Sequence, residues 1–400
     1  MILAVEDFDK LGYKMIKNEN LSPHYKFYYP DLRFITGRGP ILTDTNNVSY
    51  IDATSGWGVL AFGHCYYAIQ EAAINQIQEL VHTVGTNIDH EPQNILANEI
   101  IKKMPKTHKW KLFFANTGTE SVEGAMKLAR YHTKRPGFLS FQGGFHGRTF
   151  GSMSLGSAFN KLKDGFDPLL SDIGILPYND PDCFLKVSNG ADVAAVFVEL
   201  VQGVGGCRVA TLDFVQAIRN FCDRTGALMI VDEVQTGIGR TGRFWAFEHY
   251  NIVPDVVCSA KALGGGFALG AVIAQSKFMN WPAGAHGSTF AGHPVACAAG
   301  TVVLRKMNES FLKIIQAKSY FFRQALEAIC NIKGYKIGGL GFMLAIDIGD
   351  VSKRDEIMAK CCKNELLVLP AEPAAIRLLP PLNCEDKILR KILHVLRISL

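Results

Sequence analysis

Two acids and a lysine stand at the ends of two short apolar runs near the middle of the chain. The run at 227–231 ends in Asp232 and Glu233, and the run at 255–259 is followed closely by Lys261 and three glycines. Such runs are typical of buried parallel strands, whose carboxyl ends meet at one edge of a sheet. A lysine that can form a Schiff base, facing an acid that can pair with a pyridinium nitrogen, suits pyridoxal 5′-phosphate (PLP).

Each of these residues also has a plainer interpretation. A lysine after a strand is often a solvated loop residue, and an aspartate there often caps a helix. The segment 237–242 (GIGRTG) fits the dinucleotide-binding fingerprint, which would instead indicate a nicotinamide-dependent oxidoreductase. However, both acids separate the strand from the first glycine, and the aromatic stretch 243–250 stops before Pro254. That leaves little room for the phosphate-binding helix that the fingerprint requires.

A longer resemblance covers most of the chain. DEVQTGIGRTGRFWAFEHYNIVPD at 232–255, followed by SAKALGGGFALGAVIA at 259–274, resembles the cofactor signature of class III, fold type I, PLP-dependent aminotransferases. Within that family the chain is most similar to acetylornithine and ornithine aminotransferases, with matching segments from about residue 51 to 381. The resemblance implies an α/β fold with a mostly parallel central sheet flanked by helices, and a smaller α+β domain built from both termini.

The resemblance also divides the chain. We expect residues 1–48 to form the N-terminal segment of the small domain, 49–305 the large PLP-binding domain, and 306–400 the C-terminal small domain, which we expect to be βαβ-like. Apolar periodicity predicts the elements of these domains. The strands expected are 110–115, 138–141, 193–200, 342–347 and 375–379, and the helices are 66–80, 122–133, 212–225, 295–307, 311–329 and 354–364.

A Gly/Thr/Ser turn at 116–121 opens one of these helices. The free N–H groups and the positive dipole end of such a turn form an anion site, although ordinary N-capping uses the same residue types. By resemblance to the family, Gly118 and Thr119 form the cup for the PLP phosphate.

The resemblance assigns four more residues to the PLP ring. Glycines at 143 and 144 allow an aromatic ring to lie flat on the pyridine ring. The family then implies Phe145 on one ring face with His146 beside it, Val234 on the opposite face, and Gln235 as hydrogen-bond partner of the 3-hydroxyl oxygen.

Substrate residues are likewise implied by the family. Arg377 matches the arginine that grips the substrate α-carboxylate, a task suited to the planar guanidinium fork. Arg148 matches a substrate-contacting arginine of acetylornithine aminotransferases. Ser288 and Thr289 match a pair that crosses a dimer interface, Thr289 reaching the partner's PLP phosphate. The resemblance therefore implies an obligate homodimer with jointly built sites.

The implied chemistry is ping-pong transamination. Lys261 moves the proton as general base and acid, and Asp232 stays ionised against the ring nitrogen. The implied donor is N-acetylornithine or a related ω-amino compound, the acceptor is 2-oxoglutarate, and the pathway is arginine biosynthesis. Other class III activities stay open, namely ornithine, 4-aminobutyrate or lysine-type transamination, or amino-acid racemisation.

One position departs from the family pattern. After the EPxQG motif many relatives carry a glutamate that pairs with the carboxylate-binding arginine until an α-amino acid arrives. Here that position is Val204, and the proline of the motif is Leu200. We therefore expect Arg377 to lack this gate, with weaker discrimination between ω-amino and α-amino substrates, or an altered donor.

The composition limits the partners of the protein. Its 400 residues carry a formal net charge of +5 with no block of like charges, which argues against nucleic acid. No apolar stretch approaches the roughly 20 residues of a membrane span, and acids stand where a secretory signal would carry bases. The ten cysteines form no CxxC pair and the eleven histidines no HxxxH pattern, so we expect reduced thiols, a cytoplasmic location and no metal.

Overall fold

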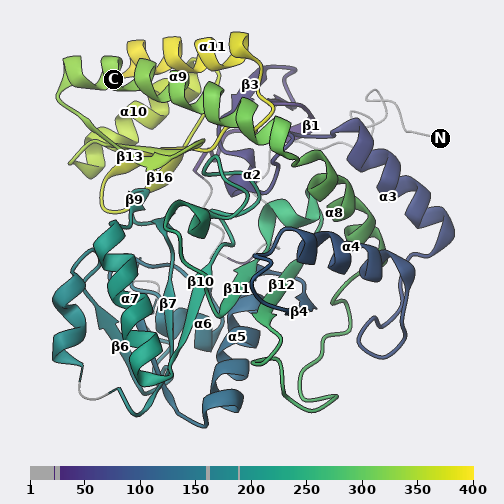
Figure 1. Cartoon of the computed structure of the whole chain (residues 1–400). Helices are drawn as coiled ribbons and strands as arrows, with labels where there is room; N and C mark the ends of the chain where they lie inside the picture. The colour runs from purple at the N-terminus through teal and green to yellow at the C-terminus, as the bar shows by residue number, and fades with distance from the viewer. Residues whose placement is uncertain (1–21, 23–27, 159–162, 188–189) are drawn as a thin grey trace.

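The computed structural model describes residue 22 and residues 28–158, 163–187 and 190–400. Its largest element is a seven-stranded sheet (Figure 1). Neighbours from β11 to β6 are parallel, and β12 runs antiparallel to the strands on both its sides, so the predicted mostly parallel sheet is confirmed. In spatial order the strands are β4 (Trp110–Ala115), β12 (Gly270–Gln275), β11 (Val256–Ser259), β10 (Leu228–Asp232), β7 (Val193–Val198), β5 (Gly137–Phe141) and β6 (Ile173–Leu176).

Helices pack around this sheet (Figure 1). The α-helices are α2 (Ser55–Gly58), α3 (Tyr67–Glu79), α4 (Glu91–Lys102), α5 (Gly118–Thr133), α6 (Phe150–Leu155), α7 (Leu212–Thr225), α8 (Pro294–Lys306), α9 (Glu309–Lys333), α10 (Val351–Lys363) and α11 (Asp386–Ser399). The 3₁₀ helices are η2 (Pro181–Lys186), η3 (Ala246–His249) and η4 (Lys261–Gly264).

The alternation of strand side chains explains why both faces of the sheet are covered. Successive residues of a strand point to opposite faces. In β10, Leu228 and Ile230 belong to the apolar cluster that contains the buried face of α5. Met229 and Val231 belong to the cluster that contains the buried face of α7. Each face of β10 is therefore removed from water, and the only polar side chain of the strand is Asp232 at its carboxyl end.

Two four-stranded sheets lie outside the central one. The first has the order β1 (Phe34–Arg38), β2 (Ile41–Asp44), β3 (Ser49–Asp52) and β15 (Leu366–Leu367), and joins both ends of the chain through parallel pairing of β15 with β3. The second has the order β13 (Lys336–Leu340), β14 (Met343–Asp347), β17 (Ala375–Leu378) and β16 (Leu369–Ala371). The short strands β8 (Val201–Gln202) and β9 (Arg208–Val209) pair separately.

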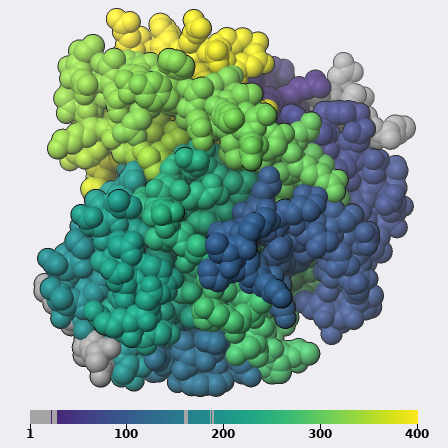
Figure 2. Space-filling model, in the orientation of Figure 1, coloured from purple at the N-terminus to yellow at the C-terminus, as the bar shows by residue number. Residues whose placement is uncertain are grey.

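The C-terminal sheet corrects one expectation. All its neighbouring strands are antiparallel, so the C-terminal part is not βαβ-like. Helix α10 leads from β14 into β15, which joins the other sheet beside β3, and so no parallel crossover is made within one sheet. Figure 2 shows the light green and yellow C-terminal residues gathered at one end of the molecule. The proposed domain boundaries at 48 and 305 stay a prediction, and much of the segment 1–48 lies outside the described residues.

Helix α5 begins four residues earlier than the predicted start at Val122. The Thr117 hydroxyl accepts a hydrogen bond from the backbone N–H of Glu120, which satisfies one of the free donors of the first turn. The helix therefore starts at Gly118, directly at the carboxyl end of β4.

Within residue 22, 28–158, 163–187 and 190–400, no helix has the length and apolar character needed to span a bilayer. In the same ranges, no three His, Cys, Asp or Glu side chains gather in a way that could hold a metal ion.

Candidate active site

The acid and the amine of the sequence motif come from neighbouring strands. β10 and β11 pair in parallel with Asp232 opposite Cys258, and Lys261 follows the end of β11 at the start of η4. Burial, reinforced by the charge of Arg377 and opposed by that of Asp232, lowers the pKa of Lys261 to about 8. The amine is therefore close enough to both groups to be influenced by their charges, and an appreciable fraction of it is neutral near physiological pH.

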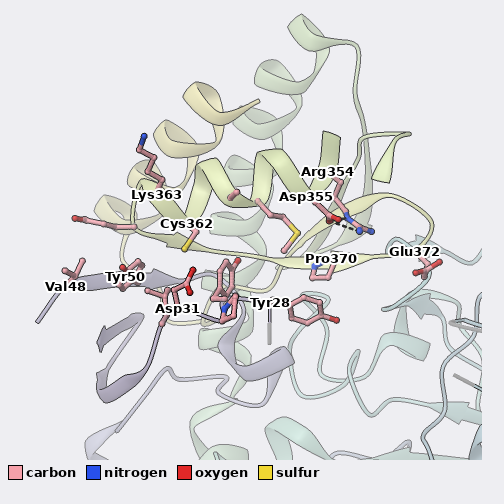
Figure 3. A pocket seen from close by; sticks show the side chains of 16 residues that line it. Tyr28, Asp31, Val48, Tyr50, Arg354, Asp355, Cys362, Lys363, Pro370 and Glu372 are labelled. Carbon is pink, nitrogen blue, oxygen red and sulfur yellow. Dashed lines mark hydrogen bonds and ion pairs between the residues drawn. The ribbon is translucent and has the colours of Figure 1, made fainter. Parts of the chain in front are cut away.

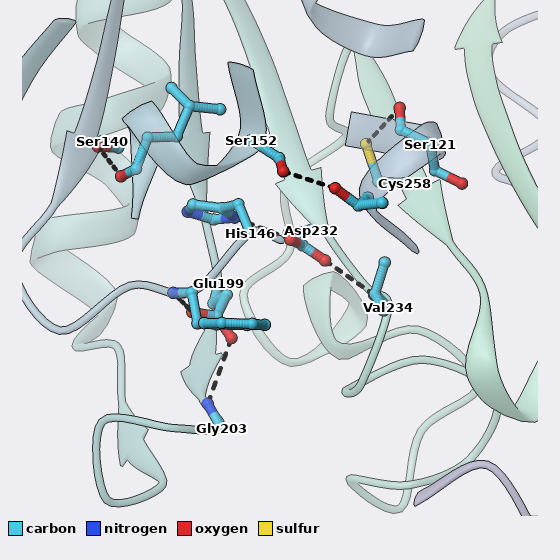
Figure 4. A network of polar contacts seen from close by, with 12 residues as sticks. Ser121, Ser140, His146, Ser152, Glu199, Gly203, Asp232, Val234 and Cys258 are labelled. Atoms are coloured by element: carbon cyan, nitrogen blue, oxygen red, sulfur yellow. Dashed lines mark hydrogen bonds and ion pairs between the residues drawn. The ribbon is translucent and has the colours of Figure 1, made fainter. Parts of the chain in front are cut away.

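Asp232 is held by two donors in a buried site. Its Oδ2 lies 2.8 Å from Nδ1 of His146, and its Oδ1 accepts a hydrogen bond of 3.0 Å from the backbone N–H of Val234 (Figure 4). Burial alone would lower the pKa of His146, but the hydrogen bond and charge of Asp232, with Glu199 behind it, raise the pKa overall. A carboxylate fixed by two donors is suited to hold one orientation against a cationic ring nitrogen.

Glu199 is a site residue that the sequence reasoning missed. Its carboxylate accepts hydrogen bonds from the backbone N–H groups of Phe145 (2.9 Å) and Gly203 (3.3 Å), and so joins the loops after β5 and β7 (Figure 4). Burial raises its pKa to about 7, with His146 opposing and Asp232 adding to the shift. The available signal was its position, since it is an acid at the carboxyl end of a strand beside β10.

The predicted phosphate cup is packed against the predicted ring residue Val234. A Cβ added at Gly118 would lie 2.7 Å from Cγ1 of Val234, so glycine is needed for this approach. The hydroxyl of Thr119 lies 2.5 Å from that of Ser152 and 2.9 Å from that of Thr149. The N-terminus of α5 thus faces the residues at the end of β10, as a phosphate site next to a ring site requires.

Arg377 lies buried in β17 with an incomplete set of partners. Its Nη1 donates to Oε1 of Gln235 at 3.1 Å, while its Nε has no hydrogen-bond partner. No carboxylate of the described residues lies within ion-pair distance of it, and burial lowers its pKa. Gln235, expected at the PLP 3-hydroxyl, also donates from Nε2 to the carbonyl oxygen of Trp57 at 3.1 Å. A buried guanidinium with a free donor is suited to a ligand carboxylate.

The remaining predicted residues are more exposed. The Arg148 side chain is exposed, and its guanidinium carbon lies 5.8 Å from the centre of the Phe145 ring. The Ser288 hydroxyl accepts a hydrogen bond of 2.8 Å from Nδ2 of Asn116, which immediately precedes the α5 turn. Thr289 is exposed on the surface of this chain. The structure thus brings Ser288 close to the phosphate cup of its own chain.

A large cavity lies elsewhere in the molecule. Its volume is about 710 Å³, and it lies between the segment 28–32 and helix α10 (Figure 3). The side chains of Arg354 and Asp355 on its wall are paired with each other at 2.7 Å. None of the residues predicted for the site lines this cavity.

The residues at the carboxyl ends of β10 and β11 fit PLP. PLP has an aldehyde, a cationic ring and a phosphate, and the site offers a group for each. The partly neutral amine of Lys261 suits the aldehyde, the fixed and buried carboxylate of Asp232 suits the ring, and the N-terminus of α5 suits the phosphate. Gly118 leaves space where a side chain would collide with Val234.

Comparison with known proteins identifies the class. Residues 29–400 match the family model "Aminotransferase class-III". The chain is 38% identical to the acetylornithine aminotransferase of Aquifex aeolicus over 92% of this chain and 96% of that protein. It is 39% identical to that of Bacillus subtilis over 88% and 91%. An ornithine aminotransferase structure from Toxoplasma gondii, described with partial occupancy of PLP, matches with TM-score 0.87 and 26% identity over 99% and 94%.

The chain belongs to the class-III aminotransferases. It has the fold of PLP-dependent transferases and is itself a PLP-dependent aminotransferase, which confirms the class, the fold and the cofactor expected from its motifs.

Proposed function

We propose that this enzyme transfers an amino group from N-acetylornithine, or a related ω-amino compound, to 2-oxoglutarate. The named relatives, acetylornithine aminotransferases at 38–39% identity, support this donor. The observation that carries the proposal is Arg377, a buried guanidinium with an unpartnered Nε within electrostatic range of Lys261. It supplies the carboxylate-binding group that an amino acid and a 2-oxo acid have in common.

Two residues carry the chemistry in this proposal. PLP, when bound, supplies an electron sink for the substrate carbon. Lys261 binds the cofactor and afterwards moves the proton as base and acid, for which its lowered pKa of about 8 is suited. Asp232, oriented by His146, holds the proton on the ring nitrogen. Because the same groups serve both half-reactions, donor and acceptor use one site in turn.

The other predicted residues position cofactor and substrate. Gly118 and Thr119 hold the phosphate at the start of α5. Phe145 and Val234 would pack against the PLP ring, and His146 and Gln235 would support its polar atoms. Arg377 binds the carboxylate next to the reacting carbon, while the exposed Arg148, whose guanidinium lies near the Phe145 ring, binds a distal one.

The proposal includes a homodimer in the cytoplasm that serves arginine biosynthesis. Exposure of Thr289, in a loop whose neighbour Ser288 lies beside the phosphate cup, supports a role across a subunit interface. None of the ten cysteines is part of a disulfide and most of them are buried, which supports a reducing compartment.

A half-reaction screen tests the proposal. The holoenzyme is mixed with N-acetylornithine, ornithine, 4-aminobutyrate or glutamate, and the cofactor absorbance is followed. Conversion by N-acetylornithine, reversed by 2-oxoglutarate, is expected; no conversion by any amino donor would refute the proposal. Turnover of an amino acid without an oxo acid would instead indicate racemisation. In Arg377→Ala the reaction with glutamate should slow by about 10- to 100-fold, since charge-assisted hydrogen bonds are lost.

A further inference from the structure

The Gln235 side chain bridges Arg377 and the carbonyl of Trp57. Its Oε1 accepts from Nη1 of Arg377, and its Nε2 donates to the Trp57 oxygen, both at 3.1 Å. The amide cannot be turned over without losing both bonds, because oxygen only accepts and NH₂ only donates. Gly203 makes room for it, since a Cβ at that position would collide with Oε1 of Gln235.

Among the described residues, the Gln235 side chain is the hydrogen-bond partner of Arg377. The guanidinium is buried, its Nε is unpartnered, and no acid side chain of the described chain forms an ion pair with it. Glu199 acts on Arg377 through its charge, but its carboxylate accepts its hydrogen bonds from the backbone N–H groups of Phe145 and Gly203. A neutral amide oxygen is therefore the group that a ligand carboxylate meets at Arg377.

We propose that Gln235 is a neutral cap on Arg377, displaced by the substrate carboxylate, and that residue 235 thereby determines carboxylate affinity. The inference rests on the proposed function, in which Arg377 binds that carboxylate. Hydrogen bonds between two charged groups are roughly twice as strong as those to neutral ones, so a carboxylate readily replaces the amide oxygen. A charged group at 235 would not be replaced without loss of an ion pair.

The test measures carboxylate binding to the holoenzyme without turnover. Glutarate, which has two carboxylates and no reacting group, is titrated into wild type and variants saturated with PLP, and its dissociation constant is read from the cofactor absorbance. Gln235→Glu should weaken glutarate binding by about tenfold, because glutarate must then displace an ion pair between residue 235 and Arg377. A tenfold loss of affinity corresponds to ~1.4 kcal/mol. Gln235→Met, similar in size but without the amide oxygen, should bind glutarate at least as tightly as wild type.

Two further arms separate this inference from the function on which it rests. Conversion of the cofactor by a carboxylate-free diamine reports any loss that residue 235 causes through the PLP ring, so in Gln235→Glu the glutarate affinity should fall by a larger factor than the rate with the diamine. Arg377→Ala should abolish the difference in glutarate affinity between Gln and Glu at 235. Equal weakening in Gln235→Glu and Gln235→Met, or wild-type affinity in Gln235→Glu, would overturn the cap while leaving Arg377 as the carboxylate site. Unchanged glutarate affinity in Arg377→Ala would overturn both.

Discussion

Nδ1 of His146 and Oδ2 of Asp232 lie 2.8 Å apart, with both side chains almost fully buried. The pair joins the loop after β5 to the end of β10, which are separated by 86 residues in sequence. Since Glu199 fixes the backbone of the adjacent Phe145, the same loop is held from two sides. The position of Phe145, the predicted ring-stacking residue, thus depends on two acids: Glu199 binds its backbone N–H, and Asp232 binds the side chain of its neighbour His146.

Removing the His146 ring should destabilise the protein. His146→Leu leaves the Asp232 carboxylate buried without its side-chain partner, which costs about 3–5 kcal/mol of unfolding free energy. His146→Asn, whose Nδ2 replaces the donor Nδ1, should lose clearly less. Urea unfolding of the two apoenzyme variants against wild type measures the difference. Equal losses would mean that ring packing, and not the hydrogen bond, is what stabilises this site.

The raised pKa of Glu199 makes a pH-dependent contribution to stability. Its folded value of about 7 exceeds the ordinary 4.5, so the favourable contribution is fully present below pH 4.5 and is lost as the pH rises through 7. Relative to wild type, Glu199→Gln should gain unfolding free energy across this window, by at most about 1.4 kcal/mol per pH unit. Urea unfolding at a series of pH values measures this gain.

Glu233 offers a matched control for Glu199. It is also buried with its pKa raised to about 7 by burial, but it accepts hydrogen bonds from Thr236 and the backbone of Phe247, neither of which is a predicted ring residue. Glu233→Gln should show the same trend in stability, whereas only Glu199→Gln should change the cofactor absorbance. A stability difference independent of pH in Glu199→Gln would contradict the shifted ionisation.

Because Gly118 packs closely against Val234, a side chain at position 118 should lower the affinity for PLP. Gly118→Ala places a Cβ 2.7 Å from Val234 Cγ1 and pushes that side chain towards the ring site. Overpacking of this kind costs about 1–3 kcal/mol, so the PLP dissociation constant should rise about tenfold or more. Titration of the apoprotein with PLP measures it. Gly118→Ala should cost less PLP affinity in a Val234→Ala background than in wild type, because the collision is removed; an equal loss in both backgrounds would exclude this contact as the cause.

Much of the architecture could be predicted because its signals are local. The helix expected at 212–225 has those bounds in the structure, and the apolar runs at 227–231 and 255–259 correspond to β10 and β11 within one residue. β12 was not predicted, although all six of its residues are buried. A short apolar run after glycines has no periodicity that identifies a strand, and its antiparallel pairing with β4 is set by residues far along the chain.

The polar bridges of the site had no local signal. Gln235 contacts Arg377 across 142 residues and Trp57 across 178, and Glu199 contacts Phe145 across 54. Residue types at strand ends predicted which side chains gather at the sheet edge. The choice of partner depends on side-chain reach and on the space left by Gly203, which only the folded chain defines.

Val204 should determine how the enzyme divides its activity between ω-amino and α-amino donors. Val204 follows Gly203, which packs against Gln235. The carbonyl oxygen of Val204 accepts a hydrogen bond of 2.7 Å from the Glu372 N–H. Val204→Glu would supply Arg377 with a charged partner that an α-carboxylate must displace, but an ω-amine need not. The ratio of kcat/KM for N-acetylornithine to that for glutamate should therefore rise, by about tenfold for ~1.4 kcal/mol. Val204→Gln, equal in size but uncharged, should leave the ratio near wild type, and a ratio unchanged in Val204→Glu would show that residue 204 does not gate Arg377.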